Sequence, residues 1–180
     1  MSVQSSDFSP ATVVAAQLSC KGCPLRVHGP VPLYVPLHVV GPASLLVFAR
    51  PYSDVVTPAE DPRLGPFLAQ FPQLASFAVT YATNCWSDPA APVPVRSLRA
   101  CQRHREAEMA TLQPRTIIAV GEAPCQQYLG VGLAKAGGQL WQHGAGAYVV
   151  PLPEGDLSQQ SVALIQQALD RDGVGYYDLS

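Results

Sequence analysis

The chain has 180 residues, of which 48% are hydrophobic and only 13% are charged, and its formal net charge is −2. This length suits one domain with a single core, and the low charged fraction predicts a compact, heavily buried fold. The charge gives no sign of a strongly basic nucleic-acid binder. No apolar stretch runs uninterrupted for the roughly 20 residues that a membrane helix needs.

The N-terminal residues, MSVQSSDFSP, are polar and lack a basic region followed by an apolar run. They therefore predict no secretory signal, and we expect residues 1–10 to form a loose tail. Residues 1–180 are expected to form one domain. The protein is expected to be monomeric, cytoplasmic and not bound to a membrane. In a reducing compartment, cysteines more often bind metals or do chemistry than form disulfides.

Short apolar runs bounded by turn-forming residues alternate with segments of helical spacing along the chain. This alternation predicts a three-layer α/β/α sandwich with a mostly parallel, four-stranded sheet. Functional residues of such sheets gather at the carboxyl ends of the strands. The expected strands are 44–49, 78–83, 116–120 and 147–152, and the expected helices are 11–18, 66–77 with a break at Pro72, 96–113, 123–137 and 156–173.

Helix ends also carry recognisable residues. Ser97 is expected to cap the helix 96–113, and Pro114 closes it. Ser158 is expected to cap the last helix in the same way.

The five cysteines include a close pair, Cys20 and Cys23, followed much later by Cys85 and Cys101. Two thiolates on one tight loop and two from distant segments can enclose a site for zinc or an iron–sulfur cluster. The spacing alone leaves a redox pair or unrelated buried thiols as alternatives. Cys125, one turn into an expected helix, is interpreted as a small buried apolar residue.

Several motifs succeed one another over residues 18–157. They are CKGCPL, an apolar strand, EDPRLGPF, YATN, a cysteine 16 positions after Cys85, LQPRTIIAVG and YLG. Their order resembles that of the iron–sulfur uracil-DNA glycosylases, often called family four. The resemblance implies that Cys20, Cys23, Cys85 and Cys101 hold a structural four-iron, four-sulfur cluster, with zinc as the alternative.

The resemblance also bears on the acidic residue of the site. The family's catalytic GEAPG comes after its first core strand, whereas GEAPC here comes after the helix that carries Cys101. Glu122 is therefore interpreted as a lookalike, an acid in the first turn of a helix that interacts with the helix dipole. The family's interval of 13 residues between the acid and Phe67 places Asp54 on the catalytic position. Counting forward from the strand places Arg50 there instead, and a solvated turn residue is the other interpretation of Asp54.

Two further residues match the family's base-binding positions. The resemblance implies that Phe67 stacks on a flipped base and that Asn84 reads its Watson–Crick edge. The alternatives are a core phenylalanine and a turn residue. The family's HPS motif is missing, since Leu152 or Glu154 stands where its histidine falls, and acidic PEGD replaces the basic loop after it. His143 is the candidate substitute, with an ordinary surface or core histidine as the alternative.

The function that these observations predict is a DNA glycosylase. It would flip uracil or a modified pyrimidine out of single- or double-stranded DNA and hydrolyse its N-glycosidic bond, with Asp54 positioning water or stabilising the cationic sugar. The altered motifs support an alternative, a catalytically degenerate scaffold that binds a nucleic acid, a nucleotide or a protein partner. A structural zinc domain is a third interpretation.

Overall fold

The computed structural model describes residues 23, 44–52, 61–71, 74, 77–88, 90–144, 146–155 and 158–171. Cys20 and Asp54, two of the predicted site residues, lie outside these ranges. Within the described ranges, none of the helices is long and apolar enough to cross a membrane.

The core of the fold is a five-stranded sheet with the order β2-β1-β3-β5-β4. Four strands run parallel: β1 (Ser44–Phe48), β2 (Phe77–Tyr81), β3 (Thr116–Val120) and β5 (Tyr148–Leu152). The fifth, β4 (Trp141–Gln142), pairs antiparallel with β5. The α/β prediction is confirmed, but the predicted number of four strands is wrong, because the chain before β5 forms a short hairpin with it.

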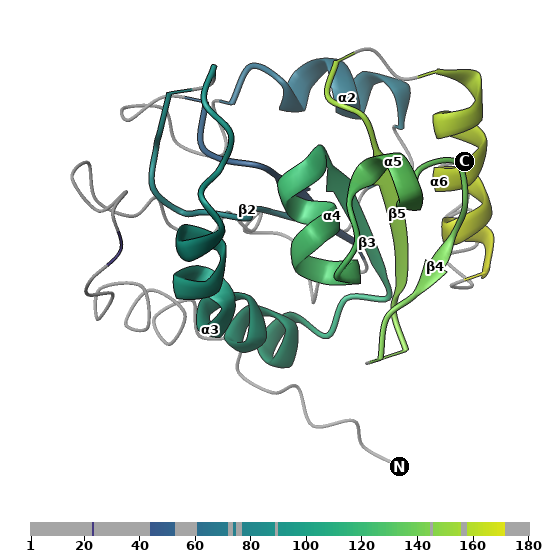
Figure 1. Ribbon diagram of the computed structural model, residues 1–180. Helices are drawn as coiled ribbons and strands as arrows, with labels where there is room; N and C mark the ends of the chain where they lie inside the picture. Colours follow the sequence, from purple (N-terminus) through teal and green to yellow (C-terminus); the bar gives the residue numbers. More distant parts are fainter. Residues whose placement is uncertain are drawn as a thin grey trace.

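Helices cover both faces of this sheet (Figure 1). One face packs against α2 (Leu64–Gln70) and α6 (Gln159–Arg171), the other against α3 (Val95–Leu112), α4 (Glu122–Leu129) and α5 (Leu133–Ala136). Alternate residues of one strand point to opposite faces. Leu46 and Phe48 of β1 accordingly join the core of α2 and α6, whereas Leu45 and Val47 join the core of α3 and α4. The arrangement is a three-layer α/β/α sandwich.

Three predicted helices differ from those of the structure. The predicted helix 66–77 corresponds to α2, which begins at Leu64 and ends at Gln70, and Phe77 already belongs to β2. The helix α3 begins at Val95 with Pro94 as its N-cap, so Ser97 is buried within the first turn and makes no capping hydrogen bond. The predicted helix 123–137 divides into α4 and α5, because Gly130 adopts φ 70° and ends α4 in the left-handed region. The Ser158 cap is confirmed, since the Ser161 N–H donates to its Oγ at 3.1 Å.

The register brings the carboxyl ends of the parallel strands to one edge of the sheet. Phe48 pairs with Tyr81 and with Val120, and Val120 pairs with Leu152. After β1 the chain forms β2 on one side of β1, and it then crosses to the other side of β1 to form β3 and β5. A topological switch point therefore lies between β1 and β3, the place where open α/β sheets bind their ligands.

Candidate functional site

A cavity of about 170 Å³ lies at this carboxyl edge. A dry cavity of about 150 Å³ is enough to hold benzene, so the space suits one six-membered ring. Its walls are mostly apolar, and two charged side chains, one of each sign, interrupt them. The principal wall residues are Phe48, Val120, Pro66, Phe67, Arg63 and Glu154.

Phe67 lines this cavity, as the resemblance implies for a base-stacking residue. It lies on α2 and is only 6% exposed, and its ring centroid is 5.1 Å from that of Phe71. Phe48, at the end of β1, contributes a second aromatic ring to the wall and packs against Tyr81 at 6.4 Å. Phe67 is thus both a core residue and an aromatic wall of the cavity, so its two interpretations are compatible.

Arg63 enters the cavity wall from the turn before α2, and its guanidinium is firmly held. The Nε and Nη2 groups donate to the two carboxylate oxygens of Asp61 at 2.9 and 2.6 Å, and Nη2 also donates to the Arg50 carbonyl at 2.9 Å. The guanidinium carbon lies 4.3 Å from the centre of the Phe48 ring, a cation–π distance. Among the described residues, Nη1 of Arg63 has no acceptor, so it is the donor available to a ligand.

Asp61 is buried, and its carboxylate accepts hydrogen bonds from two side chains at this corner of the site. Its carboxylate also accepts a hydrogen bond from the Tyr81 hydroxyl at 3.1 Å. Burial raises the pKa of Tyr81 well above its usual value, and the neighbouring Asp61 carboxylate raises it further. Tyr81 therefore stays a neutral donor that holds Asp61, and Asp61 in turn holds Arg63.

Glu154 supplies the carboxylate of the cavity, from the turn after β5. It lies directly over Gly121 at the end of β3, where a Cβ would fall 2.5 Å from the Glu154 Oε1 atom. Gly121 also has φ 96° and ψ 177°, a conformation that is essentially confined to glycine. A side chain at position 121 would therefore strain the backbone and move the Glu154 carboxylate away from the end of β3.

Arg50, the alternative position for the catalytic residue, is committed to a structural role. Its guanidinium donates to Ser87 Oγ at 3.0 Å, to the Ala91 carbonyl at 2.7 Å and to the Asp88 carbonyl. Partial burial lowers the pKa of Arg50, and the carboxylates of Glu154 and Asp88 oppose that effect. Arg50 thus fastens the loop before α3 to the edge of the cavity.

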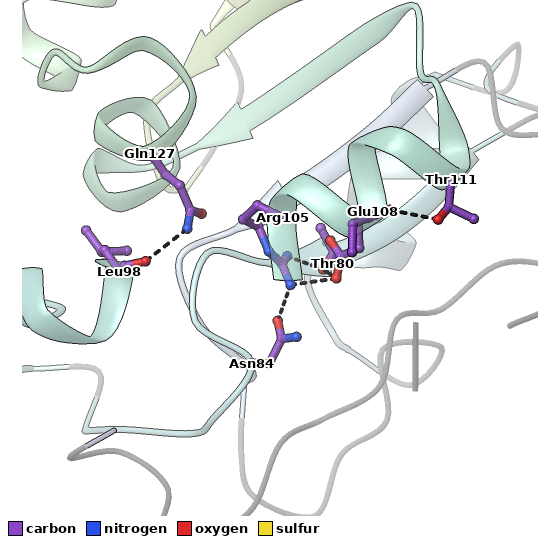
Figure 2. A network of polar contacts seen from close by, with 8 residues as sticks. Thr80, Asn84, Leu98, Arg105, Glu108, Thr111 and Gln127 are labelled. Atoms are coloured by element: carbon purple, nitrogen blue, oxygen red, sulfur yellow. Dashed lines mark hydrogen bonds and ion pairs between the residues drawn. The ribbon is translucent and has the colours of Figure 1, made fainter. Parts of the chain in front are cut away.

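Asn84 lies on the other face of the sheet from Phe67. Its Oδ1 accepts a hydrogen bond from Nη2 of Arg105, on α3, at 2.7 Å (Figure 2). The side chain is buried, and its Nδ2 has no partner among the described residues. Asn84 is not among the residues that line the cavity, so the structure does not bring Asn84 and Phe67 together in one pocket.

Glu122 caps a helix and does not face the cavity. Its Oε2 accepts a hydrogen bond at 2.7 Å from the backbone N–H of Leu133, the first residue of α5, and its Oε1 accepts one from the Gln126 amide at 2.7 Å. The acid also occupies the first turn of α4, as predicted. The interpretation of Glu122 as a lookalike agrees with this geometry.

The structure rules out His143 as a replacement for the missing histidine. It lies between β4 and β5, at the edge where the parallel strands begin, and its ring lies edge-on to Tyr128 with centroids 6.3 Å apart. The cavity is at the opposite edge, where those strands end. Sequence proximity to the missing motif is misleading here because β5 separates the two positions.

The cysteines that the structure describes are all buried thiols. Cys23, Cys85 and Cys101 are 8%, 4% and 3% exposed, and such thiols are the donors that iron or zinc sites use. No three Cys, His, Asp or Glu side chains within the described ranges meet to hold a metal ion, and Cys20 lies outside them. The four-cysteine ligand set stays a prediction.

Cys125 behaves as the sequence predicts. It is fully buried in the core beneath α4. Burial raises the pKa of its thiol to about 12, with a further contribution from Glu122. This environment agrees with the interpretation of Cys125 as a small buried apolar residue.

Comparison of the sequence with protein-family models finds no matching family, and comparison with curated proteins finds no significant match.

Proposed function

We propose that this chain is a DNA glycosylase that releases a single-ring base, uracil or a modified pyrimidine, from DNA. The observation that carries the proposal is the aromatic cavity at the switch point, sized for one six-membered ring and bordered by Arg63 and Glu154. A base can enter such a cavity only after it leaves the stack, which is how enzymes that act on bases reach their targets.

The walls and the two charged groups have complementary roles in this proposal. Phe67 and Phe48 pack on the ring, and stacking on an aromatic side chain contributes about 1–3 kcal/mol whatever the base. The Nη1 group of Arg63 donates to a carbonyl oxygen of the pyrimidine. Because negative charge builds on that oxygen as the glycosidic bond breaks, a fixed guanidinium stabilises the transition state more than the ground state.

The reaction is hydrolysis. The bond between the sugar C1′ and the base nitrogen breaks, its electron pair leaves with the base, and a water oxygen bonds to C1′. The proton that this water releases goes to a carboxylate and then to the departing base. Asp54 is the proposed carboxylate on the resemblance, and Glu154 is the carboxylate that the cavity itself supplies.

The iron–sulfur cluster is proposed as a structural group. Cys20, Cys23, Cys85 and Cys101 would hold it, and it would fasten the N-terminal part of the chain to the segment between β2 and α3. Asn84 precedes one of these cysteines, but Arg105 holds it outside the cavity, so the proposal gives it no part in holding the base. No step of the hydrolysis runs through the cluster.

An excision assay tests the proposal. Protein purified without oxygen is incubated with labelled single- and double-stranded oligonucleotides that carry one uracil, and alkali then cleaves the abasic sites. We expect the wild-type protein to cleave at uracil. Replacement of the carboxylate that takes the proton, by Glu154→Gln or Asp54→Asn, should lower the rate of excision at least about 100-fold. Glu122→Gln, whose carboxylate caps α5, is the matched control and should keep full activity.

Other outcomes discriminate between the interpretations. Loss of activity in Asn84→Ala at unchanged melting temperature would contradict this assignment and restore the base-reading role that the resemblance implies. Binding of free uracil without any cleavage of DNA would favour the binding module, and ligand-observed NMR with wild type and Phe67→Leu would locate that binding in the cavity. The proposal would be rejected if the protein neither cleaved DNA at uracil nor bound free uracil.

A further inference from the structure

The exposed side of α3 carries a row of arginines. Arg96, Arg99 and Arg103 are all exposed, whereas Leu98, Cys101 and Arg105 face the interior. Residues spaced by three or four positions share one side of a helix, and a rise of about 1.5 Å per residue spreads this row over about 10 Å. The row concentrates positive charge on one surface of a chain whose net charge is −2.

A groove of about 610 Å³ runs beside this row. Its walls include Arg99 and Gln102 from α3, Gln126 and Gln127 from α4, and the glycines 130 and 132 that come after α4. The Gln127 amide nitrogen lies 3.5 Å from the Leu98 carbonyl, and its Oε1 is buried without a donor in the part of the chain that the structure describes. Amide and guanidinium groups of this kind bind phosphate and sugar oxygens.

Arg96 and Arg99 are not explained by the stability of α3. The first turn of α3 contains no acidic residue, and no ion pair of Arg96 or Arg99 occurs within the described ranges. A cation near the N-terminus of a helix is unfavourable, because the helix dipole is positive there. A bound anion would relieve this accumulation of positive charge.

Hydrogen bonds connect the cavity wall to the loop that precedes α3. Arg63 at the cavity donates to the backbone of Arg50, and the Arg50 guanidinium donates to Ser87 and Ala91 in the loop that leads to α3. The helix α3 then starts at Val95, at the same carboxyl edge of the sheet. Arg63 and Arg50 thus link the cavity to the start of α3, whereas α3 itself covers the other face of the sheet.

We propose that Arg96, Arg99 and Arg103, with the adjoining groove, bind the phosphate backbone of single-stranded nucleic acid. The sign and spacing of the charges identify a polyanion with regularly repeated phosphates. A single strand is favoured because the proposed function needs an unstacked base, and extrusion from a duplex adds an unpairing cost. The preference for a single strand therefore rests on the proposed function, whereas the surface that binds the phosphate backbone does not.

Salt-dependent binding tests this surface. The probe is a fluorescently labelled 15-nucleotide oligothymidylate, and its anisotropy is measured with the full chain at several salt concentrations. The binding constant K falls as salt rises, and each lost phosphate contact makes the slope of log K against log salt less steep by about 0.7 for a single strand. We expect the Arg96→Gln, Arg99→Gln double variant to lose about 1.4 from the slope and to bind at least about ten-fold more weakly at low salt.

The matched control is the double variant Arg115→Gln, Arg171→Gln. It removes the same charge from two exposed arginines, one directly before β3 and one at the end of α6, away from the carboxyl edge. Affinity and slope should stay at the wild-type values. An equal loss in both double variants, or no loss in the α3 variant, would overturn the proposal, with equal melting temperatures establishing that both variants are folded.

Two comparisons define the partner and separate this proposal from the glycosylase. Tighter binding of a duplex of the same length, or equal binding of polyglutamate, would overturn the assignment to single-stranded nucleic acid. Arginine-dependent binding without excision of uracil would reject the glycosylase and keep this surface. Excision of uracil that is unaffected in the α3 double variant would keep the glycosylase and reject this surface.

Discussion

The guanidinium of Arg105 and the carboxylate of Glu108 form an ion pair of 2.6 Å in the interior, where their side chains are 2% and 0% exposed. Arg105 also donates to Thr80 and to Asn84, and the Thr80 hydroxyl donates to Glu108 at 3.2 Å. This network joins the middle of α3 to β2 and to the chain just beyond it. Figure 2 shows how the single arginine reaches all three partners.

Removal of Glu108 should be strongly destabilising. Glu108→Ala leaves the Arg105 charge buried without its counter-ion, which typically costs about 3–5 kcal/mol of the free energy of unfolding. Urea denaturation followed by circular dichroism measures the change. Glu106→Ala, an exposed acid on the same helix, should change stability by less than about 0.5 kcal/mol. A loss below about 1 kcal/mol for Glu108→Ala would show that Arg105 finds another partner or water.

Stability should fall in mildly acidic solution because of His104. Burial lowers the pKa of this imidazole below its usual 6.5, and the charges of Arg105 and Arg103 lower it further. The unfolded chain then binds the proton more tightly than the native one. Neutral His104 therefore contributes to stability above about pH 6.5, and this contribution is lost as the pH falls through its lower native pKa. The free energy of unfolding should change by at most about 1.4 kcal/mol per pH unit.

Urea titrations between about pH 8 and pH 5 measure this dependence. In His104→Gln the slope of the free energy of unfolding against pH should be shallower by up to about 1.4 kcal/mol per pH unit than in the wild type. An identical pH dependence in wild type and His104→Gln would contradict the prediction.

Gly121→Ala should disturb both stability and the cavity. The φ of 96° and ψ of 177° are strained for any residue with a Cβ, at a cost of about 1–3 kcal/mol, and the new methyl group would displace the Glu154 carboxylate. Calorimetric melting and ligand-observed NMR with uracil measure the two effects. Gly144→Ala is the control, since nothing lies within 4 Å of a Cβ there. Unchanged ligand binding in Gly121→Ala would mean that Glu154 does not contribute to the cavity's affinity.

The cysteine set makes a prediction about metal content. If the proposed cluster is present, Cys85→Ser and Cys101→Ser should each lose the iron and the visible absorbance of protein purified without oxygen, because each would remove one of the four proposed ligands. Cys125→Ala removes a thiol that is buried in the apolar core and should keep full iron content. Colourless wild-type protein with one bound zinc would support the zinc alternative, and iron retained in both serine variants would exclude these ligands.

Much of the fold could be predicted because its main strands are local apolar runs. The runs 44–49, 116–120 and 147–152 match β1, β3 and β5 to within one residue, since strands buried on both faces are apolar at nearly every position. The strand β4 was not predicted, because a two-residue strand is defined only by its pairing with β5. Ser97 was mistaken for a cap because Pro94, with its fixed φ, starts α3 earlier.

The site was predictable only in part. Phe67 could be found from its motif, and the rule that ligands bind at carboxyl strand ends places residues 121–122 and 151–154 at one edge. The close approach of Glu154 to Gly121 depends on the β3–β5 register, and the orientation of Arg63 depends on Asp61 and Tyr81 from separate elements. Contacts between such distant segments leave no periodic signal in the sequence.

The central pairing of the sheet also shapes how the chain can fold. Ser44 of β1 pairs with Thr116 of β3, so about 70 residues must be enclosed before the two inner strands meet. Contacts that are this distant in sequence slow folding, because the entropy of closing the loop is lost before the contacts form. During synthesis, β1 and β2 can pair first, but both cores stay open until β3 has left the ribosome. The apolar runs of β1 and β2 are then exposed to aggregation until β3 has followed them.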